Sequence, residues 1–169
     1  FSPYTLAGHS FQGGGVELNP GRFTFKSMYG RLRRSVVADL NSLQNIESAY
    51  RRLGWGVMAG YETANGESIK AILFKGWDDP SSIPPPDTSS NLTPKENTVI
   101  SLIGKKKLGS KASIQVDYAM SALTMNSLSP QVDDHTGILQ TIGGLFSPKS
   151  SSGYHNAIKT ALQFQTKFG

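Results

Sequence analysis

Residues 51–62 read RRLGWGVMAGYE, and apolar side chains alternate with small or polar ones along this stretch. Successive side chains of a β-strand point to opposite faces of its sheet. The stretch therefore predicts a strand whose two faces differ in character. One face carries Leu53, Trp55, Val57, Ala59 and Tyr61, and the other carries Arg52, Gly54, Gly56, Met58, Gly60 and Glu62.

The same period of two recurs elsewhere in the chain. Residues 112–123 alternate almost without a break, and Tyr154, Ile158, Leu162, Phe164 and Phe168 share one parity near the end of the sequence. Residues 9–18 and 22–36 show the pattern more weakly. Residues 68–77 and 96–107 are predicted strands whose facing is left open, because the apolar runs IKAILF and VISLI hide the period.

The connections between these strands alternate in length. Three are short and rich in Gly and Asn, at residues 19–21, 64–67 and 108–111, which is typical of hairpin turns that need positive φ. Three are long, at residues 37–50, 78–95 and 124–153. Outer-membrane barrels have short periplasmic turns and long extracellular loops. We therefore predict an all-β, antiparallel up-and-down meander of about seven strands, forming part of a transmembrane β-barrel.

The first long connection has an alternative interpretation. Val37, Leu40, Leu43, Ile46 and Tyr50 recur at intervals of three and four residues, which also fits a short amphipathic helix.

Composition agrees with a barrel and limits the function classes. The mean hydropathy of -0.29 and the absence of a long apolar run exclude a helical membrane protein, whereas a barrel hides its apolar residues at every second position. The absence of cysteine excludes disulfides and thiolate metal sites. The net charge of +5 comes from scattered basic residues, so we expect no nucleic-acid partner.

The alternation predicts what each face of the sheet contacts. Residues expected to face lipid, with aromatic rings near the headgroups, are Phe23, Phe25, Tyr29, Trp55, Val57, Tyr61, Val116 and Tyr118. Residues expected to face the lumen are Arg22, Lys26, Gly56, Glu62, Gln115 and Asp117. Basic residues outnumber acidic ones on this second face, which would favour anionic solutes in an open pore.

The chain resembles large outer-membrane β-barrel proteins of Bacteroidota along nearly its whole length. The similarity lies in the strings LAGHSFQGGGVELNPGRFTFKSMYGRLRRSV, RLGWGVMAGYE, ILFKGWDDPSSIP, PKENTVISLIGKKKL and VDYAMSALT, in this order. The resemblance implies a bacterial outer-membrane location and a longer barrel, with more strands after Gly169. It names no substrate.

No catalytic motif is present, so we expect neither enzymatic activity nor a cofactor. The run Gly13-Gly14-Gly15 lacks a following helix that would bind phosphate, and close approach of backbones explains it better. Asp133, Asp134 and His135 are more readily explained as a solvated loop than as a metal site. Asp78 and Asp79 precede Pro80 and are expected to form a turn.

The sequence thus favours a structural or transport role, porin-like or translocon-like, for residues 1–169 as one incomplete barrel domain. Its expected partners are the outer-membrane bilayer and other envelope proteins. A soluble β-sandwich acting as an adhesin-like or carbohydrate-binding module is the main alternative, and a barrel enzyme is a third. Seven strands would leave an unpaired edge in lipid, so we also expect that these residues do not form a closed, stable unit by themselves.

Overall fold

A computed structural model of the chain describes residues 11–38, 46–86, 90–132 and 146–164. These residues form one seven-stranded sheet in the order β1-β2-β3-β4-β5-β6-β7, and every neighbouring pair is antiparallel. The strands are β1 (Gln12–Leu18), β2 (Phe23–Arg33), β3 (Arg51–Glu62), β4 (Ser68–Asp79), β5 (Glu96–Leu108), β6 (Ala112–Thr124) and β7 (Ser152–Phe164). The predicted antiparallel meander of seven strands is confirmed.

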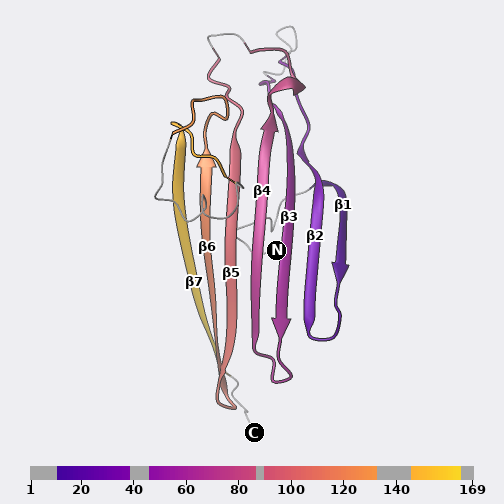
Figure 1. The fold of residues 1–169 in the computed structure, drawn as a ribbon, viewed down its shortest axis with the longest axis vertical. Coiled ribbons are helices and arrows are strands. Elements are labelled where there is room, and N and C mark those ends of the chain that lie inside the picture. The colour runs from indigo at the N-terminus through magenta and orange to yellow at the C-terminus, as the bar shows by residue number, and fades with distance from the viewer. Residues whose placement is uncertain (1–10, 39–45, 87–89, 133–145, 165–169) are drawn as a thin grey trace.

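The connections separate by length to the two ends of the sheet, as predicted. The three short turns lie together at one end, and the long connections lie at the other (Figure 1). Each short turn contains one glycine with positive φ, at Gly21, Gly66 and Gly109. A side chain at positive φ meets the preceding backbone, so glycine allows each tight reversal.

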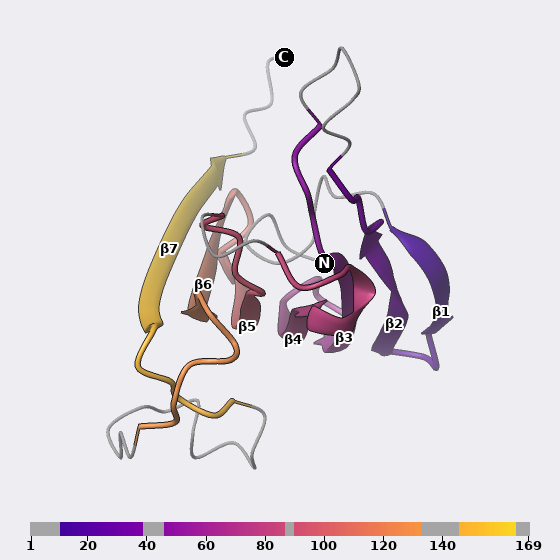
Figure 2. The same ribbon diagram turned by 90° about the horizontal axis from the view of Figure 1, so that it is seen from above.

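The sheet is an open arc when it is viewed along its strands, with β1 and β7 at the two ends (Figure 2). No backbone pairing joins β1 to β7 within the described residues. The segment that follows β6 lies on the convex side of this arc (Figure 2).

Some predicted boundaries were wrong by a few residues. The strand expected over 22–36 ends at Arg33, because the pairing of β2 with β3 shifts register between Arg31 and Arg33. The last strand begins at Ser152, two residues earlier than the alternation suggested, while Phe168 lies outside the described residues. The sequence left the facing of β4 and β5 open, and the pairing register now fixes it.

The predicted amphipathic helix falls partly on residues outside the described ranges, which include Leu40 and Leu43. Its described members Val37, Ile46 and Tyr50 are not helical. Val36 and Ala49 instead exchange two backbone hydrogen bonds of 2.8 Å, so the two sides of this loop pair as a short antiparallel bridge. The described parts of the loop therefore extend the hairpin of β2 and β3.

Candidate functional site

The register of the seven strands sorts every strand side chain onto one of two faces. We call them the convex face, which includes Val57 and Tyr118, and the concave face, which includes Met58 and Asp117. The predicted lipid-facing residues Phe23, Phe25, Tyr29, Trp55, Val57, Tyr61, Val116 and Tyr118 all lie on the convex face. The predicted lumen-facing residues Lys26, Gly56, Glu62, Gln115 and Asp117 all lie on the concave face. Arg22 precedes β2 and is exposed in the first short turn.

The convex face carries large apolar side chains that nothing in the described chain covers. The strand residues Val16, Leu18, Phe23, Phe25, Tyr29, Ile69, Leu102, Leu108, Tyr118, Tyr154, Ile158, Leu162 and Phe164 are all exposed, from 39% to 71%. All of them have the parity of the convex face. A soluble monomer rarely exposes so large a continuous apolar surface, so this face needs an apolar environment.

Charge on the convex face is confined to its two ends. Lys106 lies toward the short turns. The charged residues toward the long loops are Arg31, Arg51, Lys75, Asp79 and Glu96. Between these levels the convex positions of β2 to β7 carry no charged residue.

Aromatic rings lie at two levels of the convex face on β2 to β4. Toward the loops, Tyr29 and Trp77 have ring centroids 6.5 Å apart, and toward the turns Phe23 and Tyr61 have centroids 5.0 Å apart. Tyr61 pairs with Ile69, which precedes Trp77 by eight residues in β4. This separation between the two aromatic levels corresponds to about 27 Å along an antiparallel strand, similar to the height of the apolar band of outer-membrane barrels. Lys75 lies inside the span, so the uncharged rows cover only its part nearer the turns.

One corner of the convex face is covered by the chain itself. Phe146, only 2% exposed, packs on Ala122, Ile100 and Met120, and its ring meets Tyr154 edge-on at 5.9 Å. The described part of the connection before β7 therefore folds back over the convex face at the loop end of β5 to β7. Sequence analysis missed this contact, because no local pattern marks one phenylalanine in an irregular loop.

The concave face has a packed apolar centre. Met28, Phe74, Val99 and Ala119 form one buried cluster, and Leu32 packs against it. Phe74 shares a register row with Gly56 and Met28, so the glycine between them leaves room for the two large side chains to meet.

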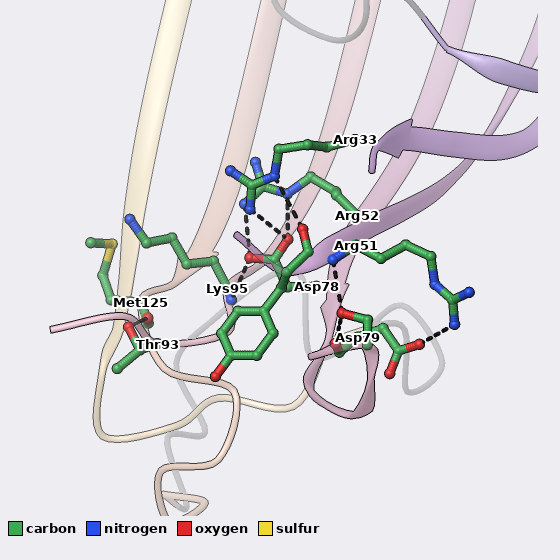
Figure 3. A network of polar contacts seen from close by, with 10 residues as sticks. Arg33, Arg51, Arg52, Asp78, Asp79, Thr93, Lys95 and Met125 are labelled. Atoms are coloured by element: carbon green, nitrogen blue, oxygen red, sulfur yellow. Dashed lines mark hydrogen bonds and ion pairs between the residues drawn. The ribbon is translucent and has the colours of Figure 1, made fainter. Parts of the chain in front are cut away.

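A carboxylate joins three segments at the loop end of the concave face. Asp78, with a side chain 2% exposed, accepts two hydrogen bonds from Arg52, of 2.8 and 2.9 Å, and lies 3.5 Å from Nη2 of Arg33. Its second oxygen accepts the backbone N–H of Lys95 at 3.0 Å (Figure 3). The register shift in β2 places Arg33 opposite Arg52, and Asp78 compensates the repulsion between these like charges.

The neighbouring Asp79 acts as a turn former, as predicted. It caps the short 3-10 helix η1 (Pro80–Ser82), accepting hydrogen bonds from the Ser81 backbone and hydroxyl. It also pairs with Arg51 (Figure 3). The Ser81 hydroxyl and then the Arg51 guanidinium hold the pKa of Asp79 below its ordinary value. Asp78, expected to form the same turn, instead belongs to the buried ion pair.

No described group of three or more His, Cys, Asp and Glu residues is arranged to hold a metal ion. The predicted loop residues Asp133, Asp134 and His135 lie outside the described ranges. None of the described helices is long and apolar enough to cross a membrane.

The chain was compared with protein-family models, curated proteins and solved structures, and none of the three comparisons found a match.

Proposed function

We propose that this chain is a wall segment of a transmembrane β-barrel in a bacterial outer membrane. Its convex face contacts the acyl chains of the bilayer, and its concave face lines the inside of the barrel. The role is structural or transport-related, without catalysis, and its partners are the bilayer and other envelope proteins.

One observation carries the proposal: all the large apolar strand side chains that are exposed lie on one face. Burying apolar surface contributes roughly 25 cal/mol per Å². A sheet that left this face in water would forgo that stabilisation and would tend to aggregate.

The uncharged band and the two aromatic levels favour lipid over a second protein sheet. A sandwich needs no charge-free band of fixed height, and it would cover its apolar face with another layer. The described strands form one sheet, and among the described residues a segment outside the sheet packs on the convex face at the Phe146 corner. A bilayer favours uncharged apolar side chains in its hydrocarbon region and amphipathic aromatic rings at the two interfaces with water.

The segregation of loops supports an orientation in the membrane. Short turns face the periplasm in outer-membrane barrels, so the turns at Gly21, Gly66 and Gly109 would be periplasmic. The resemblance to Bacteroidota barrels supports the same compartment.

The middle of the concave face is covered by packed apolar side chains, which argues against a wide water-filled pore at that level. Ile72 and Val99 are only 2% and 3% exposed on the inward side of β4 and β5, although porin lumens are polar. Polar side chains lie toward both ends of this face.

The two tryptophans of the chain allow a direct test, since Trp55 and Trp77 both lie on the convex face. We expect lipids brominated on their acyl chains to quench the fluorescence of both single-tryptophan variants, Trp55→Phe and Trp77→Phe. Iodide in the buffer should quench them weakly. Strong iodide quenching without bromolipid quenching, from protein that stays in solution without detergent, would favour the soluble β-sandwich module instead.

A further inference from the structure

The concave face carries a basic pocket at the end where the short turns lie. Lys105 and Lys107 of β5 line it, together with Lys111 of the following turn, Ser113 of β6 and Gln163 of β7. The pocket has a volume of about 160 Å³ and is open to solvent on one side. Three lysines, two serines, which include Ser110 of the turn, and one glutamine thus line one pocket.

The lysines of this pocket have little internal compensation. No described ion pair includes Lys105, Lys107 or Lys111. Glu67 is the acidic residue beside them, and its Oε1 accepts the Lys107 backbone N–H at 3.4 Å. Three lysines therefore lie near one carboxylate, and the local potential is positive.

Both acidic and basic residues lie farther along the concave face. Glu62 lies on the Lys105 row, two strands away on β3. Asp117 lies on β6 opposite Ile103, two residues along from the Lys105–Gln115 pair. It is buried and accepts a 3.0 Å hydrogen bond from the Ser101 hydroxyl. Lys70 and Lys159 lie on the same row as Asp117. The region as a whole remains basic.

We propose that this pocket binds a soluble anion that carries a phosphate group. The proposal goes beyond the membrane-wall function, because a concave basic pocket could bind an anion whether or not the convex face contacts lipid. In the proposed wall, the pocket would open inside the barrel at its periplasmic end.

The donor set fits a compact, multiply charged anion. Lysine binds phosphate as a flexible point charge, whereas arginine offers the planar fork that matches a carboxylate, and no arginine lines the pocket. Ser113 and Gln163 add hydrogen-bond donors for further phosphate oxygens. The volume also leaves room for a phosphate that keeps some of its water.

The run Lys105-Lys106-Lys107 contains its own control, because strand alternation points Lys106 to the convex face. Lys106 is exposed there at the turn end of the uncharged band, where it would meet lipid headgroups. Lys106→Gln therefore removes one positive charge from the same strand and leaves the lysines of the pocket unchanged.

The test uses the protein reconstituted in phosphatidylcholine vesicles and follows inorganic phosphate by phosphorus NMR line broadening at constant ionic strength. We expect saturable binding that weakens about tenfold or more in the Lys105→Gln/Lys107→Gln variant and less than about twofold in Lys106→Gln. No saturable binding, or equal weakening by Lys106→Gln, would overturn the proposal.

A second arm separates soluble phosphate from lipid headgroups. Phosphatidylglycerol is added to the vesicles, and its association with the protein is measured for the same variants. We expect Lys106→Gln to weaken this association and the double variant to leave it nearly unchanged. If the double variant weakens only the lipid association, the pocket binds headgroups and the proposed soluble ligand is wrong.

Discussion

Lys75 and Glu96 form an ion pair on the convex face, with 2.8 Å between Nζ and Oε1. Their side chains are 23% and 20% exposed, at the loop end of the uncharged band. In the proposed wall, this pair lies at the border between acyl chains and headgroups, where a lone charge is less well solvated than in water.

The first prediction follows from this pair. Glu96→Gln should lower the free energy of unfolding by about 1 kcal/mol, because Lys75 loses its partner carboxylate. Lys75→Leu/Glu96→Leu should recover most of this loss, since an apolar pair suits a lipid-facing surface. Urea unfolding in vesicles measures both variants. A double variant less stable than the single one would argue against a lipid-facing location for this pair.

The uncharged band gives a second prediction. Val57→Arg and Val116→Arg should each lower stability by roughly 2 to 4 kcal/mol, because each places a charge among acyl chains. Gln115→Glu is the matched control, since Gln115 adjoins Val116 on β6, faces the concave side and lies opposite Lys105, so that the new charge meets an opposite one. Its stability should stay close to that of the unchanged protein. If all three variants unfold at the same denaturant concentration, the two faces do not differ in their environment.

The carboxylate that joins β3, β4 and the start of β5 gives a third prediction. Asp78→Asn leaves Arg33 and Arg52 facing each other without compensation and should lower stability by about 2 kcal/mol. We expect less than a fully buried pair would lose, because both arginines are more than a third exposed. Asp79→Asn, at an exposed cap, should change stability much less. Equal effects of the two variants would contradict a special role for the Asp78 network.

The lowered pKa of Asp79 predicts a pH dependence. A carboxyl whose pKa is lower in the folded than in the unfolded state stabilises the fold above its unfolded pKa, and this stabilisation is lost as the pH falls through the folded value. Stability should therefore decrease below the ordinary range of aspartate titration. The decrease should be smaller in Asp79→Asn, as measured by denaturant unfolding across a pH series. An identical pH profile in the two proteins would show that Asp79 makes no contribution.

The sequence predicted the strands best where one face is apolar and the other is small or polar. Residues 51–62 and 112–124 meet this condition, and their facing could be assigned from alternation alone. In β4 and β5 the concave face is apolar too, since Ile72, Phe74 and Val99 form part of its packed centre, so period two was hidden. Only the pairing register separates the two faces in these strands.

The polar network and the covered corner could not be predicted from sequence, because both depend on contacts between distant residues. Asp78 and Asp79 are adjacent and look equivalent before Pro80, yet strand alternation sends one toward two arginines and the other toward a helix cap. Likewise, nothing next to Phe146 in the sequence indicates that its ring packs on Ala122.

The glycines of β1 and β2 give the last prediction, because the backbones of these two strands approach closely at Gly13 and Gly30. A Cβ added at Gly13 would lie 2.2 Å from the carbonyl oxygen of Tyr29, and one at Gly30 would lie 2.7 Å from that of Gln12. Gly13→Ala should therefore loosen β1 from β2 and lower stability by about 1 to 3 kcal/mol. Gly14→Ala is the control, since a Cβ there meets nothing within 4 Å and points to the convex face. Amide hydrogen exchange should show faster exchange in β1 for Gly13→Ala and no change for Gly14→Ala, because the edge strand opens locally when its pairing is strained. Unchanged amide exchange in both variants would mean that the two strands can separate enough to admit a methyl group, and that their close approach does not require glycine.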